Sequence, residues 1–219
     1  MIQGPVETLE HRWARLPGIQ SLLVTGAAAL TFDDGPDPAG TPVVLDALDA
    51  AGLQATFFML GTEVLRHPGL AREVAARGHE IAMHGFEHAD HDQLSPSDAT
   101  VEVERAVWAF ETILGVRPRW FRPPFGHLSD ASLEACRELE LNVVYWSASG
   151  NDWLSLDADE IAAGVAERLT DGVIVLLHDS ARFSPRAGVE PTAAAISAIA
   201  DVARARDIEL GPLCRLVDR

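Results

Sequence analysis

The sequence of 219 residues is short of positive charge and of cysteine. Its 17 Lys plus Arg stand against 33 Asp plus Glu, a formal net charge of -16. Contacts with nucleic-acid phosphates need clustered Lys or Arg, and no such run occurs, so we expect no nucleic-acid partner. The two cysteines, Cys136 and Cys214, lie among apolar neighbours outside any C-x-x-C pair. They predict buried free thiols and exclude a disulfide framework.

Long hydrophobic runs are also missing. No apolar stretch approaches the roughly 18 residues that span a bilayer, so we expect no membrane partner. Arg12 and Arg15 precede an apolar run, residues 16–30, that imitates a secretory signal. We reject that interpretation because cleavage there would remove the first predicted strand. The sequence as it stands predicts a cytoplasmic protein, and a secreted protein without its export signal would look the same.

What is present is a composition typical of one soluble globular domain. Hydrophobic residues make up 47% and charged residues 23%, close to globular averages. The length allows one sizeable core and leaves little room for two full domains. We expect residues 1–26 to be an N-terminal extension, with a helix over residues 6–16 packed on the outside, and residues 27–219 to form the single domain.

Short apolar runs alternate with amphipathic helices, which predicts βα units. Helix starts are marked by Thr41-Pro42, Ser95-Pro96, Ser129, Asp157 and Pro191, and two ends by Gly52 and Gly115. The expected strands cover residues 27–32, 55–60, 79–83, 120–121, 142–146, 173–177 and, more weakly, 208–213.

At roughly 30 residues per unit this is about seven units, fewer than a regular eight-unit barrel of about 250 residues. The predicted fold class is therefore α/β, a distorted or shortened (β/α) barrel with about seven βα units. An open doubly wound sheet shows the same alternation and remains an alternative on periodicity alone.

Polar residues follow the predicted strands at their carboxyl ends. In parallel α/β folds these ends gather on one face, where active sites are built. Residues more than a hundred positions apart are therefore expected to converge there. The residues are Asp33, Asp34, His84, His88, Arg122, Asp152 and His178.

Four of these residues have the chemistry expected around a metal ion. Two adjacent carboxylates, Asp33 and Asp34, repel each other, and a nearby cation relieves that repulsion. His84 and His88 stand four apart, which can present both imidazoles to one ion. Taken singly, the Asp-Asp-Gly-Pro run is also a turn signal, and an isolated H-x-x-x-H is more often structural. His91 is a competing ligand.

Five segments in order resemble the motifs of the polysaccharide deacetylases, carbohydrate esterase family 4, also called the NodB homology domain. The segments are Thr31-Phe32-Asp33-Asp34-Gly35-Pro36, His84-Gly85-Phe86-Glu87-His88, Arg122-Pro123-Pro124-Phe125, Asp152-Trp153 and Leu176-Leu177-His178. The resemblance covers residues 27–213. It implies a distorted (β/α) barrel and a metal-dependent hydrolase that removes N-acetyl groups from an N-acetylated sugar, oligosaccharide or polysaccharide.

The sequence departs from the family at two positions. Gly85 stands where the family usually has Ser or Thr after the first metal histidine, so a bracing hydroxyl is missing. Ser149 stands where the fourth motif usually begins with an additional aspartate. Both changes bear on the surroundings of the site and on the substrate groove more than on the reaction.

The chemistry of amide hydrolysis assigns a role to each residue. A two-histidine, one-carboxylate set leaves coordination positions open, so we expect Asp34, His84 and His88 to hold a divalent metal, zinc first, with cobalt, manganese or nickel as alternatives. Asp33 is the expected general base. Arg122 is expected to hold Asp33 ionised and oriented.

The remaining roles follow from the resemblance. It implies that His178 protonates the departing nitrogen and that Asp152 positions either Arg122 or His178. It also implies that the backbone N–H of Phe125 stabilises the oxyanion. Substrate contacts are expected from Phe125, Trp153, Leu176 and Pro124, with Leu176 and Trp153 around the acetyl methyl group.

Three other functions remain open at this point. Two use the same chemistry, namely an acetyl (xylan) esterase and a deformylase or amidase acting on a small amide. The third is a catalytically inactive carbohydrate-binding domain, and the presence of both Asp33 and His178 counts against it. The expected partner is an N-acetylated carbohydrate, and the expected oligomeric state is a monomer by default.

Overall fold

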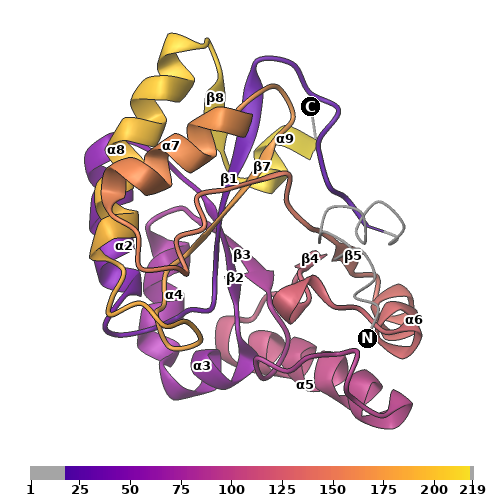
Figure 1. The fold of residues 1–219 in the computed structure, drawn as a ribbon. Helices are drawn as coiled ribbons and strands as arrows, with labels where there is room; N and C mark the ends of the chain where they lie inside the picture. Colours follow the sequence, from indigo (N-terminus) through magenta and orange to yellow (C-terminus); the bar gives the residue numbers. More distant parts are fainter. Residues whose placement is uncertain (1–17, 218–219) are drawn as a thin grey trace, which may run out of the picture.

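The fold is built on one parallel sheet whose central strand is β1 (Figure 1). The structure, a computed structural model, describes residues 18–217. The strands lie in the order β5-β4-β3-β2-β1-β7-β6, and β8 pairs with β1. Their bounds are β1 (Ala27–Asp33), β2 (Thr56–Met59), β3 (Glu80–Met83), β4 (Trp120–Phe121), β5 (Asn142–Val143), β6 (Ala148–Ser149), β7 (Ile174–His178) and β8 (Glu209–Gly211).

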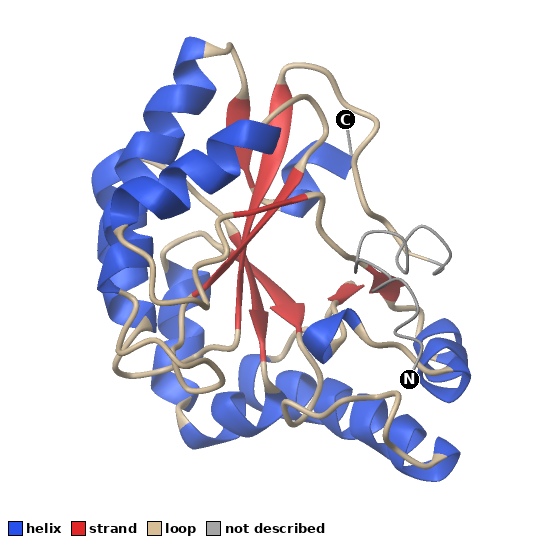
Figure 2. Cartoon of the chain, viewed as in Figure 1, coloured by secondary structure: helices blue, strands red, loops and turns tan. Residues whose placement is uncertain are grey.

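The sheet curls without closing, which leaves a seam between β5 and β6. A short extended segment at the start of the described chain lies along this seam. Ile19 forms a parallel bridge with Val144, and Ser21 forms an antiparallel bridge with Val173. This segment joins the two sides of the curled sheet, so the architecture is a distorted (β/α) barrel, as the sequence predicted (Figure 2).

The helices lie around the outside of the sheet (Figures 1 and 2). Their bounds are α2 (Thr41–Ala51), α3 (Gly61–Arg66), α4 (Pro68–Ala76), α5 (Pro96–Leu114), α6 (Asp130–Glu138), α7 (Ala158–Arg168), α8 (Glu190–Ala205) and α9 (Leu213–Val217). Of these, α3, α4 and α9 were not predicted, and neither was β6.

The predicted caps Ser95, Ser129 and Asp157 form side-chain hydrogen bonds at the helix starts. The prediction of Thr41 as a cap is wrong, because α2 begins at Thr41 after Gly40 and has no side-chain cap bond. The Ser95 side chain accepts from the N–H of Asp98 at the start of α5, and Gly115 ends that helix with a φ of 68°. Asp157 and Glu160 form a reciprocal capping box at the start of α7. A cap satisfies N–H groups that have no partner inside the helix, and these polar residues therefore fix where the helices begin.

The central strands β1 and β2 are buried along their whole length, and their residues are apolar apart from Thr31, Asp33 and Thr56. All seven residues of β1 and all four of β2 are buried. Phe32 and Phe57 stack across these strands with ring centroids 5.3 Å apart. Burial on both faces explains why the strands appear in the sequence as continuous apolar runs, without the alternation of a half-exposed strand.

Three further expectations concern the N-terminal helix, the cysteines and membrane-spanning segments. The helix predicted for residues 6–16 lies outside the described residues, so the division at residue 26 stays a prediction. Neither cysteine forms a disulfide, as expected; Cys136 is buried and Cys214 is half-buried. In the described part of the chain, no helix combines the length and the apolar character that crossing a membrane requires.

The capping box of α7 generates a stability prediction. Asp157→Ala removes the acceptor for the Glu160 N–H, and we expect the free energy of unfolding to fall by about 1 kcal/mol. Urea denaturation followed by circular dichroism measures this change. Glu167→Ala, an exposed position near the other end of the same helix, is the control and should change stability by less than about 0.5 kcal/mol. Equal effects of the two variants would contradict the role of the cap.

Candidate active site

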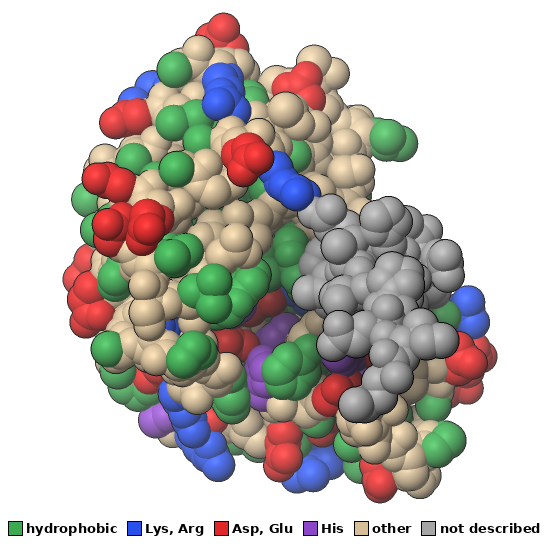
Figure 3. Space-filling model, viewed as in Figure 1, with side chains coloured by type: hydrophobic (Ala, Val, Ile, Leu, Met, Phe, Trp, Pro, Cys, Tyr) green, Lys and Arg blue, Asp and Glu red, His purple; other side chains and the backbone are tan. Residues whose placement is uncertain are grey.

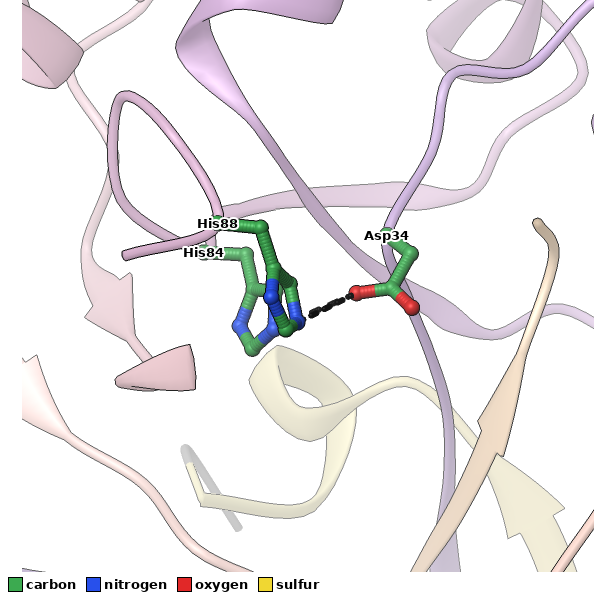
Figure 4. A group of neighbouring side chains, drawn as sticks. All are labelled: Asp34, His84 and His88. Atoms are coloured by element: carbon green, nitrogen blue, oxygen red, sulfur yellow. Dashed lines mark ion pairs between the residues drawn. The ribbon is translucent and has the colours of Figure 1, made fainter. Parts of the chain in front are cut away.

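Two histidines and one aspartate meet at the carboxyl end of the sheet. Asp34 follows β1, and its Oδ1 lies 3.4 Å from His84 Nε2 and 3.3 Å from His88 Nε2. Figure 4 shows both imidazoles turned toward this carboxylate. The three ligand atoms lie within 4.8 Å of one another. The backbone of Asp34 has a φ of 85°, an uncommon conformation for a residue other than glycine and one that clusters at functional sites.

The backbone next to Asp34 tolerates only glycine. A Cβ added to Gly35 would lie 2.1 Å from Oδ2 of Asp179. That oxygen also accepts a hydrogen bond from Thr41 Oγ1 at 2.5 Å, which fixes the Asp179 carboxylate from the side of α2. Burial raises the pKa of Asp179 to about 7, with a further contribution from the charge of Asp34. The turn after β1 is therefore constrained by close contacts on both sides.

The tautomer of His84 leaves its inner nitrogen available as a ligand. Nδ1 of His84 lies 2.7 Å from the carbonyl oxygen of Arg122. A carbonyl only accepts, so Nδ1 carries the proton and Nε2 of the neutral ring has a free lone pair. A backbone acceptor behind a histidine is the arrangement that orients metal-binding imidazoles in proteins.

The same three residues fit a divalent cation. Oδ1 of Asp34 is buried and has no hydrogen-bond partner. Burial raises the pKa of Asp34, but His84 and His88 lower it by more, so it lies well below its usual range and the carboxylate is ionised. A carboxylate oxygen together with two imidazole nitrogens that face it is the donor set of a catalytic site with open coordination positions. His91 does not belong to this donor set, because the ligand atoms that lie within 4.8 Å of one another here come from Asp34, His84 and His88; the Nδ1 of His91 lies 2.8 Å from Ser132 Oγ.

Asp33 is held by Arg122, as the sequence predicted for this pair. Nη1 of Arg122 donates to Asp33 Oδ1 at 2.7 Å and to Thr31 Oγ1 at 2.8 Å, and Nη2 donates to the carbonyl of Tyr145 at 2.9 Å. Arg122 is fully buried, and its guanidinium lies 4.0 Å from the ring centroid of Phe58. The other oxygen of Asp33, Oδ2, lies 3.8 Å from Nε2 of His84 and faces the candidate metal site.

The partner of Asp152 is His178, which resolves an alternative that the sequence left open. Oδ1 of Asp152 lies 2.8 Å from His178 Nδ1, and Oδ2 accepts from the His178 backbone N–H at 2.9 Å. The cation beside Asp152 is Arg186, whose Nη1 donates to Oδ2 at 2.9 Å. Thr192 Oγ1 also donates to Oδ2, at 2.8 Å. Asp152 is therefore bound on all sides and cannot turn toward Arg122.

This pairing changes the acidity of His178. Burial on its own lowers the pKa of His178, but the charge of Asp152 and the hydrogen bond to it raise the pKa by more, to about 9. In the same pair, burial raises the pKa of Asp152 and the charge of His178 lowers it by more. Because Nδ1 of His178 donates to Asp152, the second proton of the imidazolium sits on Nε2.

These groups open onto one cavity of about 380 Å³. Histidine side chains lie at the bottom of a hollow that hydrophobic side chains flank (Figure 3). The volume is at the small end of the range for ligand sites, and the mostly apolar lining with a few polar groups is typical of them. Its lining includes Asp33, Asp34, His84, His88, Pro123, Phe125, His127, Trp146, Trp153, Leu176, His178 and Phe183.

Three of the four predicted substrate contacts line this cavity, namely Phe125, Trp153 and Leu176. The fourth, Pro124, does not. It begins the 3₁₀ turn η1 (Pro124–Gly126) and is buried, while its neighbour Pro123 lines the cavity. Phe125 has a φ of 59°, and its side chain is about half exposed.

The loop that carries the two histidines is braced by a residue that the motifs did not indicate. Oε1 of Glu102, a buried residue of α5, accepts from the backbone N–H groups of Phe86 at 2.8 Å and Glu87 at 2.5 Å. Gly85 has a φ of 94°, which disfavours any side chain there. The carboxylate of Glu102 thus supports the loop where the family's hydroxyl is missing. A charged residue on the apolar side of a predicted helix is the signal that could have found it.

Comparison with known proteins agrees with this geometry. The family model described as "Polysaccharide deacetylase" matches residues 24–144. The chain is 34% identical over 199 residues to a chitooligosaccharide deacetylase of Bradyrhizobium sp. (strain ANU 289), covering 88% of this chain and 91% of that protein. This chain belongs to the polysaccharide deacetylase family. The family and the enzyme class implied by the five motifs are confirmed.

Solved structures of polysaccharide deacetylases share the fold. A family 4 carbohydrate esterase from Streptomyces lividans, in complex with acetate, superimposes with a TM-score of 0.77 at 30% identity, covering 86% of this chain and 93% of that one. A peptidoglycan N-acetylglucosamine deacetylase in complex with 4-naphthalen-1-yl-N-oxidanyl-benzamide gives a TM-score of 0.85 at 26% identity, covering 94% and 96%. The predicted barrel is thus the fold of this family.

The Asp152–His178 pair of this family member generates a titration prediction. Asp152→Asn keeps the shape of the side chain and removes its charge, so the pKa of His178 should fall from about 9 toward the ordinary value of 6.5. NMR titration of the imidazole resonances measures it. Asp171→Asn, an exposed aspartate before β7 whose Oδ1 accepts from Gly26 N–H, removes the same charge at the other end of the strand and should leave the titration unchanged. A shift in both variants would assign the effect to net charge.

Proposed function

We propose that this chain is a metal-dependent N-deacetylase that hydrolyses the acetamido group of an N-acetylated sugar or oligosaccharide. The observation that carries the proposal is the placement of a base and an acid, each with its own buried partner, around one two-histidine, one-aspartate donor set. The base is Asp33, whose partner is Arg122, and the acid is His178, whose partner is Asp152. A protein that only bound carbohydrate would need neither.

Asp34, His84 and His88 are the residues proposed to hold the metal. When bound, a divalent cation supplies a Lewis acid that polarises the acetyl carbonyl and lowers the pKa of water from about 15.7 toward about 7. Two imidazole nitrogens and one carboxylate suit zinc, and they also accept cobalt, manganese or nickel. Zinc is the proposed native metal.

Asp33 is the proposed general base, and its two oxygens have different tasks. Oδ1 is occupied by Arg122 Nη1, so Oδ2 is the atom that takes the proton from the attacking water. Its position, 3.8 Å from His84 Nε2, places it beside the candidate metal site. Arg122 is buried and hydrogen-bonded to four groups, so it holds the Asp33 carboxylate in this orientation.

His178 is the proposed general acid. Its Nδ1 is bonded to Asp152, so Nε2 donates the proton to the amine nitrogen as the C–N bond breaks. An amine is a poor leaving group, and a protonated imidazole with a pKa near 9 remains charged through neutral pH. The backbone N–H of Phe125 is the proposed donor to the oxyanion. Leu176 and Trp153 line the space proposed for the acetyl methyl group.

The substrate class follows from the relatives and from the cavity. The Bradyrhizobium relative is named a chitooligosaccharide deacetylase. The cavity has apolar walls and a polar floor, and the chain carries a net charge of -16, which disfavours anionic polymers. A neutral N-acetylglucosamine oligomer is therefore the proposed substrate. Acetylated xylan and small amides are the competing substrates in the assay.

Substitution of the base should separate catalysis from metal binding. Asp33→Asn is expected to bind zinc like the wild type and to lose about 10²- to 10⁴-fold in turnover, because the proton acceptor is lost while the three ligands stay in place. The amide oxygen can still accept the hydrogen bond from Arg122 Nη1. His84→Ala should lose both zinc and activity. Zinc content is measured by elemental analysis, and turnover by acetate release from N-acetylglucosamine oligomers. Wild-type acetate release by Asp33→Asn would remove Asp33 from the mechanism.

Removal of the metal should be reversible. Incubation with a chelator is expected to abolish acetate release, and addition of zinc, cobalt or manganese should restore it, because the donor atoms are fixed by the fold. The measurement is acetyl loss followed by mass spectrometry across the three substrate classes. Full activity in protein shown to have lost its metal would overturn the metal mechanism.

A further inference from the structure

Two of the phenylalanines are exposed, unlike the others. The chain has eight phenylalanines, and six of them are buried. The other two, Phe125 and Phe183, are 51% and 41% exposed, and both line the cavity of the candidate site. Exposed apolar side chains gathered at one place mark binding surfaces. Phe125 belongs to one of the five motifs, whereas Phe183 lies outside all of them.

Phe183 lies directly against one of the candidate metal ligands. Its ring stacks on the imidazole of His88 with centroids 4.4 Å apart and an interplanar angle of 8°. Phe125 meets the same imidazole edge-on, with centroids 4.5 Å apart and an angle of 79°. His88 therefore covers one face of the Phe183 ring. The exposed part of Phe183 belongs to the cavity wall next to the donor set.

Phe183 is carried by the loop between β7 and α8, residues 179–189, and an ion pair holds this loop to α3. Nη1 of Arg182 lies 2.5 Å from Oε2 of Glu63, whose side chain is 2% exposed. The Arg182 side chain is itself 44% exposed, so the contact links the loop to α3 at the surface of the molecule. On the far side, Arg186 donates to the carbonyl oxygens of His178 and Ser180.

Glu63 has a second cation that does not belong to the loop. Nη1 of Arg66, also on α3, lies 2.7 Å from Oε1. Removal of Arg182 therefore leaves Glu63 paired with Arg66 and releases only the loop. Removal of Arg66 leaves the loop attached through Arg182. The two arginines share one carboxylate and form a matched pair of variants.

We propose that Phe183 is a specificity-determining residue of this deacetylase, the surface on which the sugar ring that bears the acetamido group packs, and that the Glu63–Arg182 ion pair positions it. This deepens the proposed function and rests on it. A pyranose presents a face of C–H groups, which packs on an aromatic ring, and a polar edge, which here would face the polar floor of the cavity. An acetamide without a ring has no such face and makes no use of Phe183.

The test compares a ringed and an unringed substrate. Phe183→Ala should lower kcat/KM for N-acetylglucosamine oligomers about tenfold, mainly by raising KM, because a contact made equally in the bound substrate and in the transition state is lost. Phe183→Trp should restore it. Hydrolysis of N-methylacetamide should stay at the wild-type rate. Trp108→Ala removes an exposed aromatic side chain of α5 that does not line the cavity, and it should change neither substrate.

A second comparison of variants tests the Glu63–Arg182 ion pair. Arg182→Ala should raise KM for the oligomers in the same direction as Phe183→Ala and by less, because the ring remains but is no longer held. Arg66→Ala should behave as the wild type. Equal effects of the two arginine variants would assign the ion pair to stability alone and remove it from the proposal.

Binding measurements keep this proposal separate from the proposed function. Oligomer binding to the zinc-loaded protein should weaken about tenfold in Phe183→Ala whether or not acetate is released. The measurement is the change in tryptophan fluorescence, because Trp146 and Trp153 line the cavity. Wild-type binding that yields no acetate from any substrate would overturn the deacetylase assignment and leave Phe183 as a sugar contact. The role of Phe183 would be overturned if Phe183→Ala bound the oligomers like the wild type. It would also be overturned if this variant bound zinc more weakly and hydrolysed both substrates more slowly to the same extent.

Discussion

The site depends on a single buried guanidinium. Arg122 is fully buried and donates to a carboxylate, a hydroxyl and a backbone carbonyl that come from distant parts of the chain. The carbonyl of the same residue fixes the ring of His84. Leaving a buried charge without its partners is costly, so these groups are held in one arrangement. The proposed base and a proposed metal ligand are thus positioned by opposite ends of one residue.

Some of this site could be predicted from the sequence because it obeys a rule of the fold. Asp33, Asp34 and His178 lie where parallel strands end, and the carboxyl ends of such strands meet at one edge. The pairing of Asp152 was not predictable in the same way. Its cation, Arg186, lies in a loop, and no periodicity predicts which loop residue reaches a given strand end. Glu102 was overlooked because a single acidic residue in a helix is usually solvated.

In the fold, too, features set by neighbouring residues were predictable, and features set by distant residues were not. The ends of α5 and α7 were predictable since caps such as Ser95 and Asp157 act within a few residues. By contrast, α3 and α4 begin without a side-chain cap, and only Pro68, the first residue of α4, marks the break between them at His67. The two-residue strand β6 is defined by its pairing with β7, so it becomes visible only once the sheet is assembled.

The position of β1 at the centre of the sheet has a consequence for how the chain reaches this structure. Thr31 Oγ1 in β1 donates to the carbonyl of Val175, and Ile19, which precedes β1, bridges Val144. The first strand and the segment before it therefore pair with residues more than a hundred positions later in the chain. Contacts of such long sequence separation form slowly, because the entropy of closing the loop is lost before the pairing stabilises it. On the ribosome the N-terminal half would leave an edge of β1 open until β7 emerges. Asp33 and His178 become neighbours only when β7 pairs with β1. The active site is therefore expected to assemble late in folding.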